Sequence, residues 1–265
     1  MKALHTLATA FAVTAATVGI GSSAMAFTIT PNNNGTDLLN ALLGTTTGLS
    51  NFSVTPTGGA AAFGLFSADP FGLTDGIVLS TGEVVDVVGP NDAPNESFDF
   101  GATGVAGDDI SLDISFDADA TADKLFFSYV FGSEEFPEFV KQGFNDSFEL
   151  LLNGVNLAKL NNGDLVTVDN LGSGSPDFIS NPPGSPGTQL DGYSTVLTFE
   201  GLLNKNAKNT LSIKIKDVGD GIFDSAVLIK GKSLGTVKPI PEPAMVLGLL
   251  SFGGLMVQRR RMKKA

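Results

Sequence analysis

Apolar and polar residues alternate strictly in two parts of this chain. From Ile110 to Phe116 every second residue is apolar, and the residues in between are Ser or Asp. The same period of two runs from Leu211 to Lys216, with Ser and Lys at the polar positions. Successive side chains of a strand point to opposite faces, so both segments are expected to be strands with one buried and one exposed face.

About ten short segments have strand character, and turn residues separate them. The chain contains 32 Gly and 13 Pro in 265 residues, a composition that suits short strands and turns better than long helices. The expected strands are Phe52–Thr55, Ala60–Phe66, Gly76–Ser80, Ile110–Phe116, Lys124–Phe131, Ser147–Leu152, Leu165–Val168, Tyr193–Phe199, Thr210–Lys216 and Ser225–Lys230.

One short helix is expected near the start, with Thr36-Asp37 as its cap, leucines at helical spacing from Leu38 to Leu43, and Gly44 as its stop. Asn153-Gly154 is a hairpin turn signal. Because no helices alternate with the strands, the pattern predicts an all-β fold, an antiparallel β-sandwich of jelly-roll type.

The N-terminus reads as a secretory signal peptide over residues 1–26. Lys2 precedes an apolar run from about Leu7 to Ile20, and Ala24 and Ala26 supply the small residues of a signal-peptidase site. Cleavage there would remove His5, the single histidine, and the chain has no Cys. These two absences exclude a catalytic Ser-His-Asp or Cys-His arrangement in the exported protein.

The C-terminus, residues 238–265, reads as a sorting segment. Pro241-Glu242-Pro243 precedes 14 apolar residues, Ala244 to Val257, and then the basic cluster of Arg259, Arg260, Arg261 and two lysines. Fourteen residues are short for a bilayer span, and the basic end is expected to stay cytoplasmic. The segment resembles the PEP-CTERM sorting signal of Gram-negative bacteria. The resemblance implies a C-terminal sorting helix, transient insertion into the inner membrane, and processing by an exosortase-type protease.

The exported part is strongly acidic. Residues 27–240 keep 27 of the 28 acidic residues and 10 of the 16 basic ones, so their formal charge is about −17. Such a charge argues against nucleic acid as a partner and favours divalent cations.

Three stretches concentrate the residues that could carry a function. Thr74–Gly82 contains Asp75 and a run of small polar residues. A second stretch reads Phe-Gly-Ser-Glu-Glu-Phe, with Glu134 and Glu135, and is followed by Phe-Asn-Asp, which ends at Asp146. The third, from Asp217 to Ala226, adds Asp220 and Asp224.

In these stretches the chain resembles the choice-of-anchor L domain, which occurs on exported bacterial proteins that carry one of several C-terminal sorting signals. The match runs from about Leu38 to Ser233, which predicts a choice-of-anchor L-like β-sandwich domain over 27–237. The resemblance implies an exported protein with a separate anchor, and it implies no activity.

Clustered carboxylates repel one another unless a positive group joins them. Ca²⁺ takes about 6–8 oxygen ligands in adaptable geometry, so the sequence predicts a calcium site. Its candidate ligands are Glu134, Glu135, Asp146, Asp217, Asp220 and Asp224. The alternative is a set of solvated loop acids. The loop Asp117–Asp123 has the oxygen spacing of an EF-hand but lacks its Gly and its final Glu, and is interpreted as a hairpin turn.

These observations predict an exported, non-catalytic β-sandwich module of the cell envelope, cell surface or extracellular matrix, stabilised by calcium and adhesive or glycan-facing. Extracellular polysaccharide or surface proteins would be its partners. The alternative is a glycan hydrolase that uses a pair of carboxylates from Glu134, Glu138 and Asp146. An ice-binding surface is disfavoured, because only Thr45–Thr47 resembles a threonine ladder.

Overall fold

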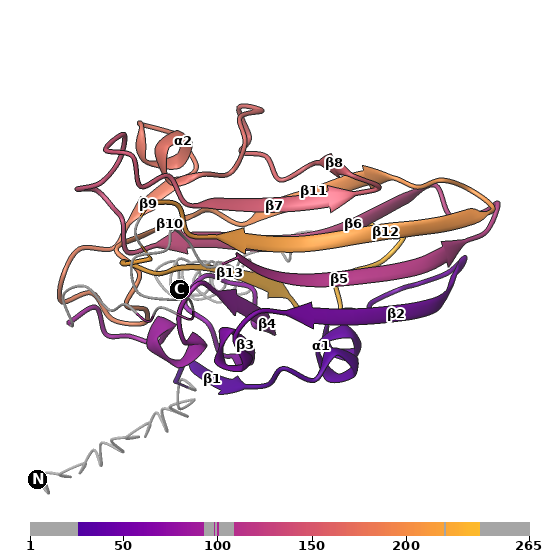
Figure 1. Ribbon diagram of the computed structural model, residues 1–265, viewed down its shortest axis with the longest axis horizontal. Helices are drawn as coiled ribbons and strands as arrows, with labels where there is room; N and C mark the ends of the chain where they lie inside the picture. Colours follow the sequence, from indigo (N-terminus) through magenta and orange to yellow (C-terminus); the bar gives the residue numbers. More distant parts are fainter. Residues whose placement is uncertain (1–25, 93–97, 99, 101–108, 220, 239–265) are drawn as a thin grey trace, which may run out of the picture.

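The computed structural model describes residues 26–92, 98, 100, 109–219 and 221–238. Two antiparallel β-sheets face each other (Figure 1), which confirms a mostly β, sandwich-like fold with few helices. The jelly-roll connectivity stays a prediction. The expected C-terminal helix, the sorting residues from Pro241 to Arg261, and Ala24 lie outside the described residues, whereas Ala26 is exposed just before the first strand.

Sheet I is the larger sheet and runs in the order β1-β3-β4-β13-β6-β10-β9, with β11 also paired to β6. Its strands are β1 (Thr28–Pro31), β3 (Phe63–Ser67), β4 (Asp75–Ser80), β6 (Lys124–Ser133), β9 (Phe178–Ser180), β10 (Gly192–Ser194), β11 (Leu197–Leu202) and β13 (Ser225–Lys230).

Sheet II has five strands in the order β2-β5-β12-β7-β8. They are β2 (Leu49–Thr57), β5 (Asp109–Ala118), β7 (Ser147–Leu152), β8 (Val155–Asn156) and β12 (Ala207–Lys216). Two α-helices, α1 (Gly35–Leu42) and α2 (Val168–Gly172), and two 3₁₀ turns, Ala60–Ala62 and Val84–Val87, complete the described elements. Among them no helix is long and apolar enough to cross a membrane.

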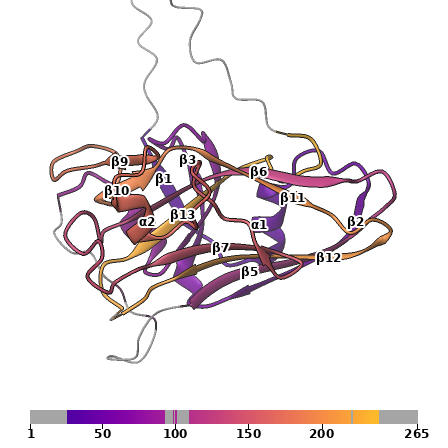
Figure 2. The same cartoon turned by 90° about the horizontal axis from the view of Figure 1, so that it is seen from above.

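The main core fills the space between the two sheets, which Figure 2 shows as two layers. The apolar residues of the two alternating segments point inward, and Ile114, Phe116 and Ile213 are all at most 1% exposed. They pack with rings from sheet I, including Phe127 and Phe131. The period of two in the sequence therefore marks the inner face of sheet II, as predicted.

Sheet I is buried on both faces along its central strands. Every residue of β6 after Lys124 is buried, and so is every residue of β4 after Asp75. A second apolar cluster, which includes Val78, Val130 and Leu228, covers the outer face of this sheet. This second burial explains why β4 and β6 read as continuous apolar runs while β5 and β12 alternate.

Helix α1 confirms the expected helix, but its cap was predicted wrongly. The cap is Asn34, whose side-chain oxygen accepts hydrogen bonds from the backbone N–H groups of Thr36 (3.0 Å) and Asp37 (3.2 Å). The helix continues only to Leu42, and its leucines pack into the main core.

Four other segments differ from expectation. The strand expected over Ala60–Phe66 begins only at Phe63, because Ala60–Ala62 forms a 3₁₀ turn. Leu165–Val168 is no strand: Leu165 and Thr167 form only isolated bridges, and α2 begins at Val168. Tyr193–Phe199 is divided between β10 and β11. The loop Asp117–Asp123 is no hairpin turn, because it connects β5 of sheet II to β6 of sheet I. Its Asp119 carboxylate accepts hydrogen bonds from the Thr121 hydroxyl (2.6 Å) and backbone (2.7 Å).

The Asn153-Gly154 turn is confirmed. Both residues have positive φ, 52° and 82°, and they join β7 to the short strand β8.

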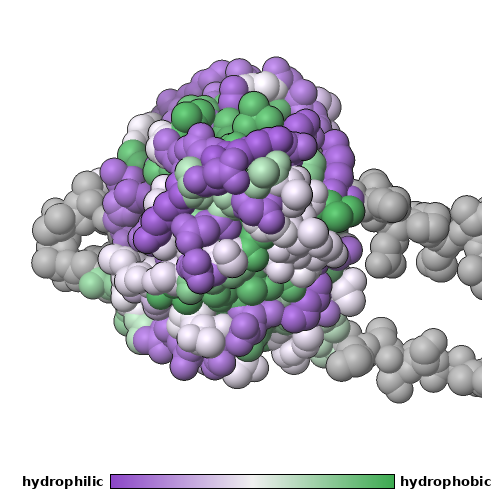
Figure 3. All heavy atoms as spheres, turned by 90° about the vertical axis from the view of Figure 1, so that its right-hand side faces the viewer, coloured by the Kyte–Doolittle hydropathy of each residue, from purple (hydrophilic) through white to green (hydrophobic). Residues whose placement is uncertain are grey.

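Figure 3 looks at the end of the sandwich where the β5–β6 connection lies, and there polar and apolar residues are intermixed.

The last described segment is held between α1 and the first residues of β6. Leu234 exchanges hydrogen bonds with the backbone on either side of Leu43, as its oxygen accepts from Gly44 (2.9 Å) and its N–H donates to Leu42 (3.0 Å). Gly235 and Phe126 donate to each other's backbone oxygens at 3.1 and 2.9 Å. The chain is therefore clamped on both sides shortly before Lys238.

Candidate functional site

The three stretches singled out in the sequence meet at one end of the sandwich, on the left in Figure 1. There β4 and β6 end, and the register pairs Ser80 with Ala226 and Ser133 with Ser225 at the start of β13. In sheet II the same end pairs Lys216, at the end of β12, with Ser147, at the start of β7. Loops that lie far apart in sequence are thereby brought together.

Asp146 connects the two sheets at this end. It is completely buried directly before β7, and its Oδ1 accepts a hydrogen bond from the Val218 N–H at 2.8 Å. Its Oδ2 accepts from the Ser225 hydroxyl of β13 at 2.6 Å. Burial raises the pKa of the Asp146 carboxyl well above its usual range, and the nearby negative charges of Asp217 and Asp224 raise it further.

Asp224 lies against the loop that follows β4. Its Oδ1 accepts a hydrogen bond from the Thr81 hydroxyl at 3.3 Å, and that hydroxyl oxygen accepts one from the Ser225 N–H at 2.9 Å. A Cβ atom on Gly82 would lie only 1.9 Å from Asp224 Oδ2. Gly82 therefore makes room for the carboxylate.

The two glutamates leave the end of β6 and are also buried, with Glu134 5% and Glu135 1% exposed. The Glu134 N–H donates to the backbone oxygen of Asp224 at 3.1 Å, and the Glu135 N–H donates to the Ser133 hydroxyl at 3.0 Å. Both side-chain oxygens of Glu135 are shielded from solvent. We call Thr81, Glu134, Glu135, Asp146, Asp217, Asp224 and Ser225 the polar network.

The structure thus brings Asp146, Asp217 and Asp224 close enough for their charges to interact, and it attaches the Glu134 backbone to Asp224. Asp220 lies outside the described residues. Within the described part of the chain, no three acidic side chains are grouped as the ligands of one metal ion. The calcium site stays a prediction.

A cavity of about 700 Å³ opens beside the polar network. The β6 extension lines it with Glu134, Phe136 and Glu138, while Phe223 from the loop before β13 and Asp191 from the segment before β10 line other parts. The Asp191 carboxylate accepts a hydrogen bond from Asn91 Nδ2 at 2.7 Å. Burial raises the pKa of Asp191, and the negative charge of Glu138 adds to this effect.

Sequence reasoning missed Asn91 and Asp191 in this cavity. They are 100 positions apart, and neither belongs to an acidic run or a recognisable motif. The one local signal is the Pro182-Pro183 pair, which by itself indicates only a loop. The glutamates and Phe223 belong to the stretches already singled out.

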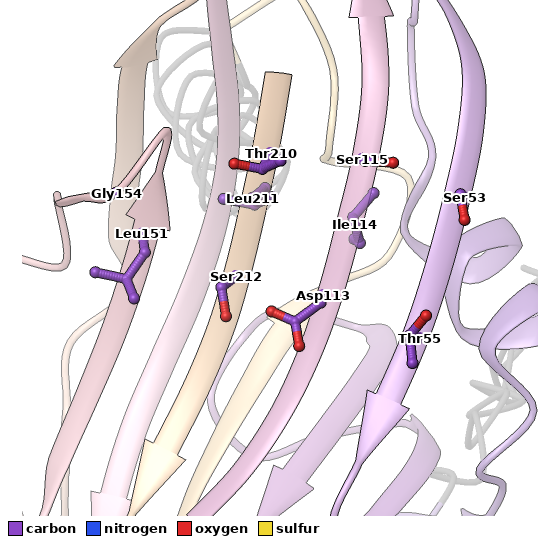
Figure 4. A pocket seen from close by; sticks show the side chains of 10 residues that line it. All are labelled: Ser53, Thr55, Asp113, Ile114, Ser115, Leu151, Gly154, Thr210, Leu211 and Ser212. Atoms are coloured by element: carbon purple, nitrogen blue, oxygen red, sulfur yellow. The ribbon is translucent and has the colours of Figure 1, made fainter. Parts of the chain in front are cut away.

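A second hollow, of about 370 Å³, lies on the outer face of sheet II (Figure 4). The strand register sets small hydroxyl side chains in a row across three strands, Ser53 beside Ser115 beside Thr210. The next row places Asp113 between Thr55 and Ser212. This face can exchange hydrogen bonds with a polar ligand, but its alternating pattern is also that of an ordinary solvated sheet face.

A protein-family model described as the choice-of-anchor L domain matches residues 28–235 of the chain. This range covers most of the chain and every described residue of the polar network and the cavity. No curated protein matches the chain.

Proposed function

The chain belongs to the choice-of-anchor L domain family and is therefore an exported, surface-anchored β-sandwich module, and from this premise we propose a non-catalytic, calcium-stabilised module that presents an adhesive or glycan-facing surface. We further propose that it reaches the cell envelope or extracellular matrix of a Gram-negative bacterium through a C-terminal PEP-CTERM signal and an exosortase-type protease. The observation that carries the proposal is the convergence of the three distant stretches in one buried polar network.

The hydrogen bonding of Asp146 supports a structural rather than a catalytic role for the network. Both of its oxygens accept hydrogen bonds from protein groups, and it has no exposed surface. A catalytic carboxylate must reach its substrate. Asp146 is therefore better suited to joining the sheets than to attacking a glycosidic bond.

The charges of the network support a cation. Carboxylates buried beside one another are costly when ionised, and either a proton or a metal ion lowers that cost. Carboxylate and backbone oxygens are the ligands that Ca²⁺ prefers. Its ligands would be drawn from Asp146, Asp217, Asp220, Asp224 and the two glutamates, and it would fix the loops after β4 and β6.

The proposed metal is tested by the melting temperature of the purified protein with excess Ca²⁺ and with a chelator. A ligand that binds only the folded state at 100 times its Kd adds about 2.7 kcal/mol, which for a chain of this size raises Tm by about 5–10 °C. Asp220→Ala should abolish this shift, whereas Asp119→Ala, in the β5–β6 connection, should preserve it. A Tm that responds to neither chelation nor Asp220→Ala would refute the calcium part of the proposal.

The non-catalytic role is tested with a panel of glycans, in which binding and bond cleavage are measured on the same samples. Binding without turnover is the expected result. Turnover that Glu134→Gln abolishes would instead establish a carboxylate-based hydrolase.

A further inference from the structure

The cavity beside the polar network combines carboxylates with flat apolar rings. We propose that it binds a glycan whose sugar rings carry free amino groups, such as a chain of glucosamine units. This inference rests on the proposed glycan-facing function and names the ligand class. The volume of about 700 Å³ lies within the range of about 300–1,000 Å³ that is usual for small-ligand sites.

The charge of the cavity selects a cation. Asp92, Glu134, Glu138 and Asp191 all line it, and its described lining contains no Lys or Arg. A protonated amine that enters the cavity would face carboxylates on more than one side. Each of these contacts would be a charge-assisted hydrogen bond, which is stronger than a bond between neutral groups.

Buried hydrogen bonds hold one of these carboxylates in place before any ligand arrives. Asn91 is 4% exposed, and its Nδ2 donates both to Asp191 Oδ1 and to the backbone oxygen of Asn181, each at 2.7 Å. The Asn181 side chain in turn donates to the backbone oxygens of Thr188 (3.0 Å) and Leu190 (2.7 Å). Asp191 therefore needs little reordering to accept a ligand, which reduces the entropic cost of binding.

The apolar walls favour a sugar ring over a bare cation. Phe139 and Phe223 are partly exposed and form a ring pair with centroids 4.7 Å apart. Phe136 is completely buried and packs against Phe178 at 4.9 Å, so the sugar would meet the first pair. Pro137, Pro182 and Pro183 line the same cavity. Rings of this kind present flat surfaces to the C–H faces of a sugar, and a phenyl face also attracts an ammonium group.

A glycan is preferred to a lysine-rich peptide because the lining offers little to a peptide backbone. A bound peptide strand commonly pairs with a free sheet edge, and the residues named in the lining come mainly from loops. A positively charged peptide is therefore the competing ligand that the experiment has to include.

The experiment is isothermal titration of the purified protein at about pH 6, where the sugar amines are protonated. The probes are a tetramer of glucosamine, the N-acetylated tetramer of the same length, and tetralysine. The glucosamine tetramer should bind at least about tenfold more tightly than either of the others. Doubling the ionic strength should weaken it, because the attraction is partly screened.

Two variants locate the site. Glu138→Gln combined with Asp92→Asn removes two charges from the cavity rim, where both residues are exposed, and should weaken glucosamine binding by about tenfold or more without lowering Tm. Asp123→Asn, which removes an exposed acid at the β5–β6 connection, should leave the affinity unchanged. Equal effects of the double variant and the control would overturn the assignment to this cavity.

The remaining outcomes separate this inference from the function on which it rests. Equal affinity for the acetylated and the amino tetramer would refute the amine selectivity while leaving a glycan-facing module intact. Tetralysine binding as tightly as the glucosamine tetramer would show that charge alone is recognised, and would refute the glycan assignment. Binding of neither sugar, by a protein whose Tm still responds to Ca²⁺, would refute both the cavity assignment and the glycan-facing surface.

Discussion

At Gly82 the backbone passes so close to Asp224 that any side chain there would overlap the carboxylate. The Thr81 hydroxyl donates a hydrogen bond to Asp224. Thr81 is itself tied to the Ser225 backbone, because its N–H donates to the Ser225 oxygen and its hydroxyl accepts from the Ser225 N–H. The run of small polar residues after β4 therefore has a packing reason. It lets two loops approach each other at a buried carboxylate.

Gly82→Ala is accordingly expected to lower the free energy of unfolding by about 2–4 kcal/mol, because Asp224 must move and lose a buried hydrogen bond. Urea denaturation of the two proteins measures the difference. Gly35→Ala is the matched control, since an added Cβ at the start of α1 comes no closer than 3.1 Å to a side-chain atom of Pro56. If both variants were equally stable, the close approach at Gly82 would not matter.

Asp146 is expected to be more sensitive to truncation than to loss of charge. Asp146→Ala leaves the Val218 N–H and the Ser225 hydroxyl without their buried acceptor, which should cost about 2–4 kcal/mol in urea denaturation. Asp146→Asn keeps a carbonyl oxygen for Val218 and removes the repulsion by Asp217, so it should cost clearly less. The reverse order of the two variants would contradict a structural role for this carboxylate.

The sequence indicated these acids because they stand in dense local runs, and acids in loops after neighbouring strands of a sandwich can meet at one end. It could not indicate Asp191 or Asn91, since their contact depends on how a long loop folds over the end of β6. The prediction of the α1 cap failed for a related reason. Asn34, Thr36 and Asp37 are all suitable cap residues, and which of them takes that place depends on where the helix begins.

Among the elements, the strands with one exposed face were the easiest to predict. The alternation in β5 and β12 reflects one buried and one solvated side, and their pairing in register sets Leu211 opposite Ile114. The central strands β4 and β6 of sheet I carry no such period because a second apolar cluster covers their outer face, whereas β11 at the side of this sheet does alternate. The short strands β1 and β9 could not be foreseen, because segments of three or four residues carry too little pattern, and β10 was merged with β11 into one expected strand for the same reason.

Because one face of β12 is buried and the other is exposed, truncating neighbouring residues of this strand should change the free energy of unfolding by very different amounts. Ile213→Ala should lower the free energy of unfolding by about 2–5 kcal/mol, because the side chain is completely buried between the sheets. Ser212→Ala, on the outer face beside Asp113, should change it by no more than about 0.5 kcal/mol. Thermal or urea unfolding of both variants measures the contrast, and similar losses would contradict the assignment of the two faces.

For the whole molecule, the family match and the two sheets agree with an exported β-sandwich, while the two terminal signals remain predictions from sequence patterns. Both signals are read from composition and residue order, and of residues 1–26 and 238–265 only Ala26 and Lys238 are among the described residues. What the sequence could not provide is which strands pair with which, since strands as distant in sequence as β4 and β13 become neighbours in sheet I only in the finished fold.

Processing at both ends gives the prediction that belongs to this scale. The intact mass of the protein recovered outside the cytoplasm should lack residues 1–26 and the basic tail after about Pro241. Expression of a Glu242→Ala variant is the control, and its C-terminal segment should remain uncleaved. Recovery of a form outside the inner membrane that still carries Met1 and Ala265 would refute the sorting prediction.

The backbone hydrogen bonds that clamp the last described segment should determine how the protein responds to a pulling force. A force applied to the chain beyond Lys238 would act first on the exposed ion pair of Lys238 with Glu200 and on the hydrogen bond from the Thr236 N–H to the Thr45 oxygen. It would then act on the hydrogen bonds that Gly235 and Leu234 make with Phe126 and with the α1 end. Gly44 and Gly235 bring these backbones so close that a Cβ on either would lie within 2.4 Å of a facing oxygen. Single-molecule pulling through the C-terminus should therefore give a distinct first rupture that Gly235→Ala weakens. A cell-bound form of the protein could thus bear tension at this seam while the sandwich that carries the cavity stays folded.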